Sequence, residues 1–239
     1  ERLHATMVAL ERMEESLVLS KPDTLLIISP HAPRYPDAWS ANMSPKFTAH
    51  MQEFGDHETA IPARVNYLLL DRIHRAMREE KIPFTLRSSE QLEYGYTVPL
   101  TLLARSFTNP NLVPLAPSEL PLAEQERFGQ QLYRILQKEE GRIAVIASAD
   151  LTHHLVPGST ETHPEAIQYD ETLRQAARSK DLTALIAASA TLPADQHPCG
   201  ERPIAILMGL LQSLNTHYEE LCYEAPFNVG YLTGSYRVA

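Results

Sequence analysis

Apolar positions along the chain fall into two patterns, which predict strands and helices in turn. Continuous apolar runs at residues 24–28 and 142–147 are typical of strands buried on both faces, as in a parallel sheet. Apolar residues at helical spacing, such as Leu3, Met7 and Leu10, predict amphipathic helices instead. We expect helices over residues 1–19, 63–81, 94–107, 119–138, 164–179 and 181–190, and one that opens at Pro203.

Shorter apolar runs between these helices predict further strands, at residues 82–86, 111–115 and 227–236. The polar, proline-containing segment 34–62 is expected to be a long connection, and long connections at strand ends are often binding loops. Because strands alternate with helices, we predict one α/β domain over residues 1–239, with a largely parallel or mixed central sheet flanked by helices.

Composition and charge narrow the class of protein. The 239 residues are 44% hydrophobic, and their net charge of −9 argues against a nucleic-acid partner. No apolar run approaches the roughly 18 residues that a membrane span needs, so we expect no membrane partner. The two cysteines, Cys199 and Cys222, give no disulfide framework, which favours a cytoplasmic protein. Homo-oligomerisation is expected on general grounds only.

Histidines follow both of the predicted buried strands. His31 lies in a turn between two prolines after the first strand, and His153 follows the second. Ligands of open α/β sheets collect at the carboxyl ends of strands, so both imidazoles are candidates for one site. Asp150, three residues before His153, could orient an imidazole as a carboxylate does around a metal centre.

The loop at residues 195–203 is a third candidate for chemistry. It contains His197, Cys199 and Glu201, beside a predicted helix N-terminus that favours anions and thiolates. Two histidines and one anionic ligand form the facial triad of non-haem Fe(II), which leaves positions open for substrate and oxygen. The residues predict that His31 shares a metal with this loop, with His153 as ligand or proton shuttle. Taken singly, His31 could instead cap its turn, and His197 could be a surface residue.

Four short motifs follow one another along the chain. They are residues 29–33 (SPHAP), 148–153 (SADLTH), 199–204 (CGERPI) and 226–231 (PFNVGY). Their order and spacing resemble the class III extradiol ring-cleavage dioxygenase superfamily, which includes LigB-type catalytic subunits and their Memo relatives. The resemblance implies a mononuclear non-haem Fe(II) site, or a site for another divalent metal, at one end of the central sheet.

The resemblance also implies roles for five residues. His31 would be a metal ligand, and His153 would be the acid–base group that handles the catechol hydroxyl proton, with Asp150 beside it. Cys199 matches the position where the Memo branch carries a cysteine ligand. Glu201 is the alternative third ligand, because ring-cleaving members use a glutamate from this region.

Two departures from the family pattern bear on function. Relatives carry a first metal-binding histidine after an N-terminal strand, which we expect to lie outside these 239 residues. Tyr94 stands where many relatives have a histidine. The leading hypothesis is an Fe(II)-dependent extradiol-type dioxygenase that cleaves a small catecholic aromatic with O₂. The alternatives are a Memo-like metal- or redox-linked binding protein without ring cleavage, which Cys199 favours, and a scaffold that has lost its metal.

Overall fold

The apolar run at residues 24–28 forms the centre of a mixed sheet, and the run at residues 142–147 forms a half-buried strand at its edge. In the computed structural model, β1 (Thr24–Ile28) lies between β7 (Asn111–Ala116) and β8 (Ile143–Ala147) and pairs in parallel with both. All five residues of β1 are buried, as expected for a strand covered on both faces. The structure describes the whole chain except residues 1–2, 154, 156–163, 194–196 and 239.

The other strands of this sheet join the second edge of β7. Near its end β7 pairs antiparallel with β2 (Trp39–Asn42), which pairs in parallel with β5 (Phe84–Arg87). Near its start β7 pairs in parallel with β4 (Asp56–Val65). The sheet then continues through antiparallel β3 (Lys46–Met51) and parallel β6 (Gln91–Leu92). The sheet is therefore mixed, with a parallel centre.

The prediction of a long connection over residues 34–62 is wrong. The segment contains β2, β3 and the 3₁₀ turn η1 (Gln52–Phe54), and it continues into β4. Phe47 and Ala49 are buried at alternate positions of β3, which is the period of a strand. The helix expected from residue 63 is α2 (Tyr67–Glu79), which begins only at Tyr67. Asn66 caps it, because its side chain accepts the Leu69 N–H.

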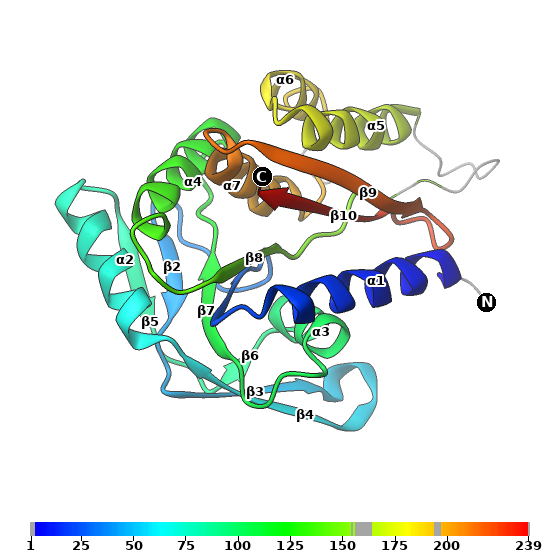
Figure 1. The fold of residues 1–239 in the computed structure, drawn as a ribbon. Helices are drawn as coiled ribbons and strands as arrows, with labels where there is room; N and C mark the ends of the chain where they lie inside the picture. The colour runs from blue at the N-terminus through cyan, green and yellow to red at the C-terminus, as the bar shows by residue number, and fades with distance from the viewer. Residues whose placement is uncertain (1–2, 154, 156–163, 194–196, 239) are drawn as a thin grey trace.

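Seven helices of the described residues flank the sheet. Besides α2 they are α1 (His4–Ser20), α3 (Tyr94–Leu103), α4 (Leu122–Leu136), α5 (Pro164–Ser179), α6 (Thr183–Ser189) and α7 (Glu201–Leu211). In Figure 1, α4 and α7 lie together above β8, and α1 lies with α3 below it. The predicted α/β class is confirmed. Pro99 lies inside α3.

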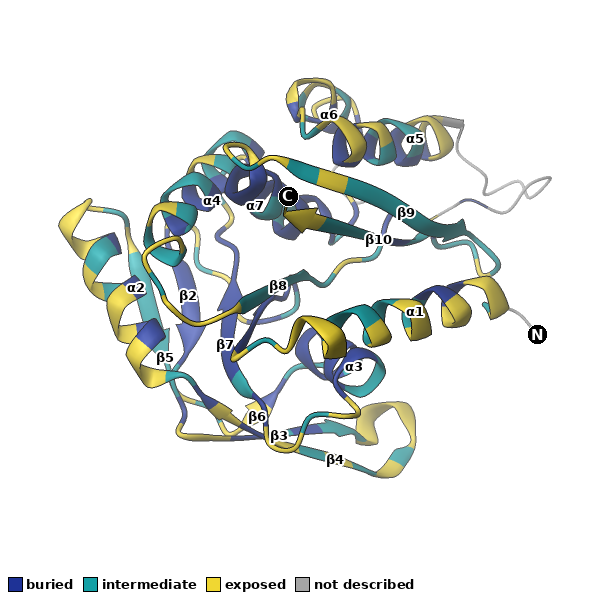
Figure 2. Ribbon diagram, viewed as in Figure 1, coloured by how far each residue is buried: buried dark blue, intermediate teal, exposed yellow. Residues whose placement is uncertain are grey.

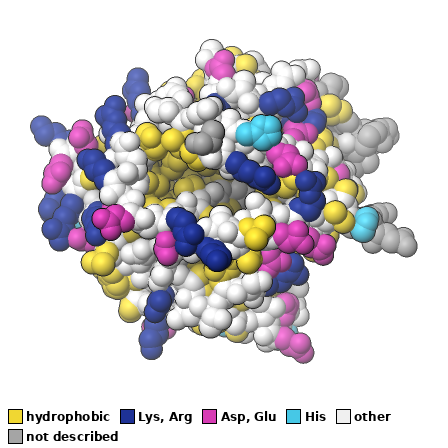
Figure 3. Space-filling model, in the orientation of Figure 1, with side chains coloured by type: hydrophobic (Ala, Val, Ile, Leu, Met, Phe, Trp, Pro, Cys, Tyr) yellow, Lys and Arg dark blue, Asp and Glu magenta, His cyan; other side chains and the backbone are white. Residues whose placement is uncertain are grey.

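A separate antiparallel hairpin closes the chain. It consists of β9 (Thr216–Glu224), which the sequence reasoning missed, and β10 (Tyr231–Val238). Figure 2 shows that most of this hairpin is half-buried, as is β8, which among the described strands pairs only with β1. Figure 3 shows a hollow lined with hydrophobic side chains on the face of the molecule that is turned to the viewer in Figure 1. None of the described helices has the length and apolar character that crossing a bilayer requires.

Candidate functional site

Strand register brings His31 and Asp150 to the same edge of the sheet. Ile28 of β1 is the register partner of Ala147 of β8, and each of the two site residues lies three positions beyond its strand end. The Ser148 N–H donates to the Ile28 carbonyl at 3.0 Å and so extends the pairing past the strands. Burial lowers the pKa of His31 below its ordinary value, and the negative charge of Asp150 opposes this shift. His31 is therefore neutral near pH 7.

The turn that carries Cys199 is hydrogen-bonded to the segment after β8, at Asp150. The Asp150 N–H donates to Cys199 Sγ at 3.4 Å, and the Gly200 N–H donates to the Asp150 carbonyl at 3.1 Å. A Cβ at Gly200 would lie 2.6 Å from that carbonyl oxygen and 2.7 Å from the Ala149 Cβ. Only glycine allows this close approach, which places the thiol beside the end of β8.

Burial sets the protonation state of this thiol. It raises the pKa of Cys199 to about 11, although the backbone hydrogen bond from Asp150 opposes the shift. At neutral pH the group is a thiol, not a thiolate. A metal or another cation would have to displace its proton before the sulfur could act as an anionic ligand.

Tyr94, the first residue of α3, is a direct partner of His31. Its hydroxyl and His31 Nδ1 are hydrogen-bonded at 2.7 Å, and the two ring centroids lie 4.2 Å apart. Burial raises the pKa of Tyr94, and the negative charge of Asp150 adds to the shift. The phenol is therefore protonated, and it occupies one of the two ring nitrogens of His31.

Aromatic side chains continue outward from Tyr94. Phe54, in η1 at the tip of the β3–β4 hairpin, meets the Tyr94 ring edge-on at a centroid distance of 5.5 Å and is 58% exposed. Burial and the charge of Asp150 raise the pKa of Tyr231. Sequence reasoning treated the hairpin as a connection and missed Phe54, although it identified the segment as a candidate binding loop.

Glu201 faces a different cluster. Its buried carboxylate accepts hydrogen bonds from the hydroxyls of Tyr169 and Ser189, the latter at 2.9 Å, and lies 3.1 Å from His197 Nδ1. These partners come from α5, from α6 and from the loop before α7. The structure describes no contact between Glu201 and His31. Its role as a metal ligand stays a prediction.

His153 is exposed, and its described contact is an isolated backbone bridge to Val229. The structure describes no contact between its imidazole and either His31 or Cys199. Its proton-transfer role therefore stays a prediction. His154, next to His153, and Asp195 and Gln196 of the 195–203 loop lie outside the described residues.

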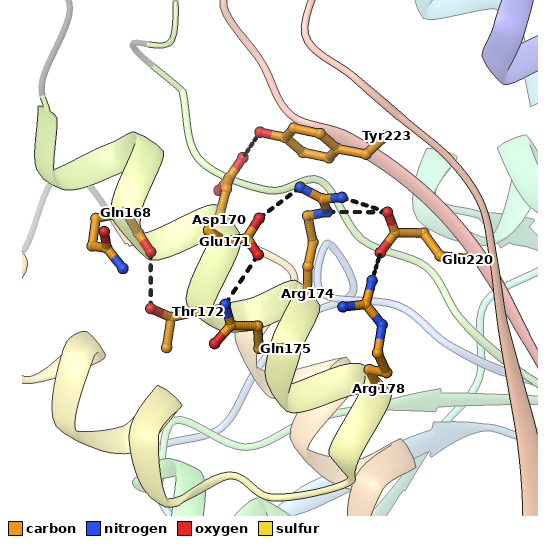
Figure 4. A network of polar contacts seen from close by, with 9 residues as sticks. All are labelled: Gln168, Asp170, Glu171, Thr172, Arg174, Gln175, Arg178, Glu220 and Tyr223. Carbon is orange, nitrogen blue, oxygen red and sulfur yellow. Dashed lines mark hydrogen bonds and ion pairs between the residues drawn. The ribbon is translucent and has the colours of Figure 1, made fainter.

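A buried carboxylate holds the backbone between Asp150 and His153. Asp170 of α5 is 1% exposed and accepts the Thr152 N–H at 2.9 Å, the Thr152 hydroxyl at 2.6 Å and the Tyr223 hydroxyl at 2.7 Å. Figure 4 shows the ion pairs beside it, where Arg174 of α5 contacts Glu220 of β9. This network ties the site segment to α5 and the hairpin. Sequence reasoning missed it, because no local pattern marks Asp170.

A metal centre needs more donors than this cluster supplies. The imidazole of His31 and the thiol of Cys199 are donor types that divalent transition metals accept. Among the described residues, however, no three His, Cys, Asp or Glu side chains are placed to hold one ion. The described residues do not complete a metal site, so the chemistry below is derived from the side chains alone.

Comparison with known proteins decides the family. Residues 3–234 match the family model described as the catalytic LigB subunit of aromatic ring-opening dioxygenase. The chain belongs to this LigB family. Four short motifs therefore predicted the family correctly, and the match extends over nearly all of these 239 residues.

One curated relative and one solved structure show how far the likeness of this LigB chain reaches. Protein CA_C1420 of Clostridium acetobutylicum is 22% identical over 241 residues, which cover 97% of this chain and 52% of that protein. The chain thus spans about half the length of this curated relative. The crystal structure of uncharacterized protein JW3007 from Escherichia coli K12 superposes with a TM-score of 0.64 at 16% identity, over 94% of this chain and 91% of that chain. This likeness shows a shared fold.

Proposed function

We propose that this chain forms an extradiol-type ring-opening site, which cleaves a small catecholic aromatic with O₂. LigB family membership supports a dioxygenase-type fold. The observation that carries the proposal is that His31, Asp150 and the Cys199 turn meet at the carboxyl edge of β1 and β8. Ligands of open α/β sheets bind at this edge.

The side chains of the site suit a hydroxylated aromatic ligand. Because its Nδ1 is hydrogen-bonded to Tyr94, which fixes the ring, neutral His31 has a single ring nitrogen, Nε2, left for either a metal or a ligand hydroxyl. The edge-on pair of Tyr94 and the exposed Phe54 provides an aromatic surface for a planar ligand. We assign proton transfer from the catechol hydroxyl to His153, with Asp150 beside it, as the family resemblance implies.

Fe(II) is the cofactor that the proposal includes, with another divalent metal as the alternative. In such a site the metal supplies O₂ activation and binding of the substrate oxygens. We propose His31 and Cys199 as ligands, with Glu201 as the competing third candidate. A complete set of metal ligands then requires a donor from outside the described residues, because those residues do not place three ligand side chains together.

The test is oxygen uptake with a panel of catechols, on protein loaded with Fe(II) under anaerobic conditions. Ring opening adds both atoms of O₂ to the catechol, so mass spectrometry of the product measures the reaction directly. We expect His31→Ala to lose activity by at least about a hundredfold, as expected for a group central to the reaction. His217→Ala, at an exposed position of β9, is the control that keeps it. Absence of the product with every catechol contradicts the proposal.

A second candidate function is a metal- or redox-linked binding protein without ring cleavage. Two observations favour it: a cysteine thiol stands in the site, and Tyr94 occupies one ring nitrogen of His31. This candidate predicts metal binding that Cys199→Ser abolishes, with no oxygen uptake. Metal analysis and oxygen uptake on the same preparation separate the two functions. Both cysteines are free thiols, which supports a proposed cytoplasmic location.

A further inference from the structure

Two adjacent residues of α5 hold the two segments of chain that meet at the candidate site. Asp170 accepts hydrogen bonds from the N–H and the hydroxyl of Thr152, in the segment after β8. The hydroxyl of Tyr169 donates to Glu201, the first residue of α7. Both side chains of α5 are buried, since Tyr169 is 2% exposed and Asp170 is 1% exposed. One point on α5 is therefore bonded to the segment after β8 and to the start of α7.

The same two segments are also bonded directly to each other. The Asp150 N–H donates to Cys199 Sγ, and the Gly200 N–H donates to the Asp150 carbonyl. A closed ring of hydrogen bonds results, which we call the α5 clamp. It leaves α5 at Thr152 and follows the backbone to Asp150. It then crosses to the Cys199 turn and returns to α5 through Glu201. The turn is held from two sides, because it cannot move without breaking buried hydrogen bonds.

The carboxylate of Glu201 is the acceptor on which this ring depends, and it is 3% exposed. Besides the Tyr169 hydroxyl, its Oε1 accepts the Ser189 hydroxyl of α6 at 2.9 Å. Its two oxygens lie 3.1 and 3.2 Å from His197 Nδ1. Burial raises the pKa of Tyr169, so this phenol keeps its proton and donates it. A carboxylate that turned toward a metal ion would deprive two buried hydroxyls of their acceptor, which is costly.

We infer that Glu201 is a positioning residue of the Cys199 turn, as part of the α5 clamp, and not a ligand of the metal. Its carboxylate acts through the hydrogen bonds that join α7 to α5 and α6. The clamp itself follows from these contacts alone. The statement about the metal rests on the proposed function, and it deepens that function by removing Glu201 from the candidate ligands.

Alkylation of Cys199 in the metal-free full chain tests the clamp without any turnover. Both cysteines are free thiols, so iodoacetamide labels both and peptide mass spectrometry follows each one. We expect Glu201→Ala to speed labelling of Cys199 at pH 7.5 by about tenfold or more, because the turn loses its bonds to α5 and α6. Cys222, on β9, is the internal reference, and its rate should stay unchanged because the loosening is local.

Milder variants separate the clamp from a general loss of packing. Glu201→Gln keeps an oxygen that accepts from Tyr169 and Ser189, so the thiol should be labelled within about twofold of the parent rate. Tyr169→Phe removes one buried hydroxyl and should speed labelling by about fivefold or more, and it decides the question if Glu201→Ala folds poorly. Tyr67→Phe, at an exposed tyrosine of α2, should not change the rate. Labelling of Cys199 at the parent rate in Tyr169→Phe, or acceleration that the reference thiol shares, overturns the clamp.

Co(II) is the probe for the question of the ligand, because a cobalt–thiolate bond absorbs strongly in the near ultraviolet. Glu201→Gln should bind Co(II) within about threefold of the parent affinity and with the same thiolate absorption, because its hydrogen bonds remain. Cys199→Ser is the control that loses this absorption. If Glu201 were a ligand, a neutral amide would replace a charged donor, and the affinity would fall by at least about tenfold. Such a fall overturns the inference.

The inference and the proposed function fail separately. A parent chain that binds no Co(II) and opens no catechol removes the proposed function, and the alkylation rates then decide the clamp alone. Catechol cleavage by the parent chain that Glu201→Gln loses together with its Co(II) affinity leaves the ring-opening function standing and removes the inference.

Discussion

His31 and Cys199 reach the same edge of the sheet by different routes. His31 is fixed by its own turn, in which its N–H donates to Ser29 Oγ at 3.2 Å, and by the hydroxyl of Tyr94. Cys199 is fixed by backbone contacts of its turn with Asp150, which Gly200 permits. Each residue is thus held through both its backbone and its side chain, and burial keeps both groups uncharged near pH 7.

The protonation of Cys199 gives a direct prediction for its reactivity. A thiol with a pKa of about 11, against an ordinary value of 9.0, holds about a hundredfold less thiolate near pH 7.5. In the metal-free Cys222→Ser variant, alkylation by iodoacetamide should be slow at that pH. It should quicken about tenfold for each pH unit up to about pH 11.

Denatured protein of the same variant is the control, because its thiol titrates normally and should react at the ordinary rate. Alkylation of the folded variant as fast as the denatured one at pH 7.5 would show that the thiol is not protected by burial.

Sequence reasoning reached the site residues that follow strands, and it missed their partners. His31 and Asp150 could be predicted together because each lies just beyond an apolar run that forms a strand, although β8 is half-buried and not buried on both faces as predicted. Tyr94 stood out only as a departure from a family pattern. Its bond to His31 joins positions 63 residues apart, and no local pattern encodes such a contact.

At the scale of elements, α5 is joined to the site segment through Asp170. The carboxylate accepts three hydrogen bonds from two distant stretches of chain, one before α5 and one in β9. Sequence periodicity predicted α5 within the bounds that the structure shows, but it did not predict β9. The half-buried strand β9 lacks the continuous apolar run by which β1 was found.

Truncation of Asp170 should therefore destabilise the protein strongly. Asp170→Ala leaves the buried Thr152 N–H without an acceptor, and we expect a loss of about 2–4 kcal/mol in the free energy of unfolding. Asp71→Asn, which removes an exposed ion pair on α2, should cost less than about 1 kcal/mol. Urea denaturation measures both changes. Equal stabilities of the two variants would contradict the role of Asp170.

The same carboxylate should leave a signature in the pH dependence of stability. Burial raises the pKa of Asp170 above its usual 3.8, although the hydrogen bonds from Thr152 oppose the shift. The folded state then holds this proton more tightly than the unfolded chain, which favours folding below the unfolded pKa. That contribution is lost as the pH rises through the folded pKa. Asp170→Asn does not titrate. The free energy of unfolding of the parent protein, relative to this variant, should therefore fall as the pH rises from the unfolded to the folded pKa of Asp170.

At the scale of the whole molecule, the packing of α7 against α4 helps to hold the later part of the chain to the sheet. Residues 24–147 form the main sheet, and α7 delivers Cys199 to it from a later segment. α7 packs against α4 through a glycine on each helix: a Cβ at Gly129 would lie 2.0 Å from the Ile206 carbonyl, and one at Gly209 would lie 2.0 Å from the Glu126 carbonyl. The two helices therefore approach more closely than any side chain at these positions would allow.

This contact should set both the stability of the fold and the placement of the thiol. Gly129→Ala forces backbone apart, and we expect it to cost about 1–3 kcal/mol and to lower the melting temperature by several degrees. Gly141→Ala is the matched control, because its Cβ would lie 3.6 Å from the Asp23 carboxylate, an ordinary contact. Since α7 carries the Cys199 turn, Gly129→Ala should also speed alkylation of that thiol at pH 7.5, and Gly141→Ala should not. Melting temperatures and alkylation rates that are the same in both variants would show that the α4–α7 contact does not position the site.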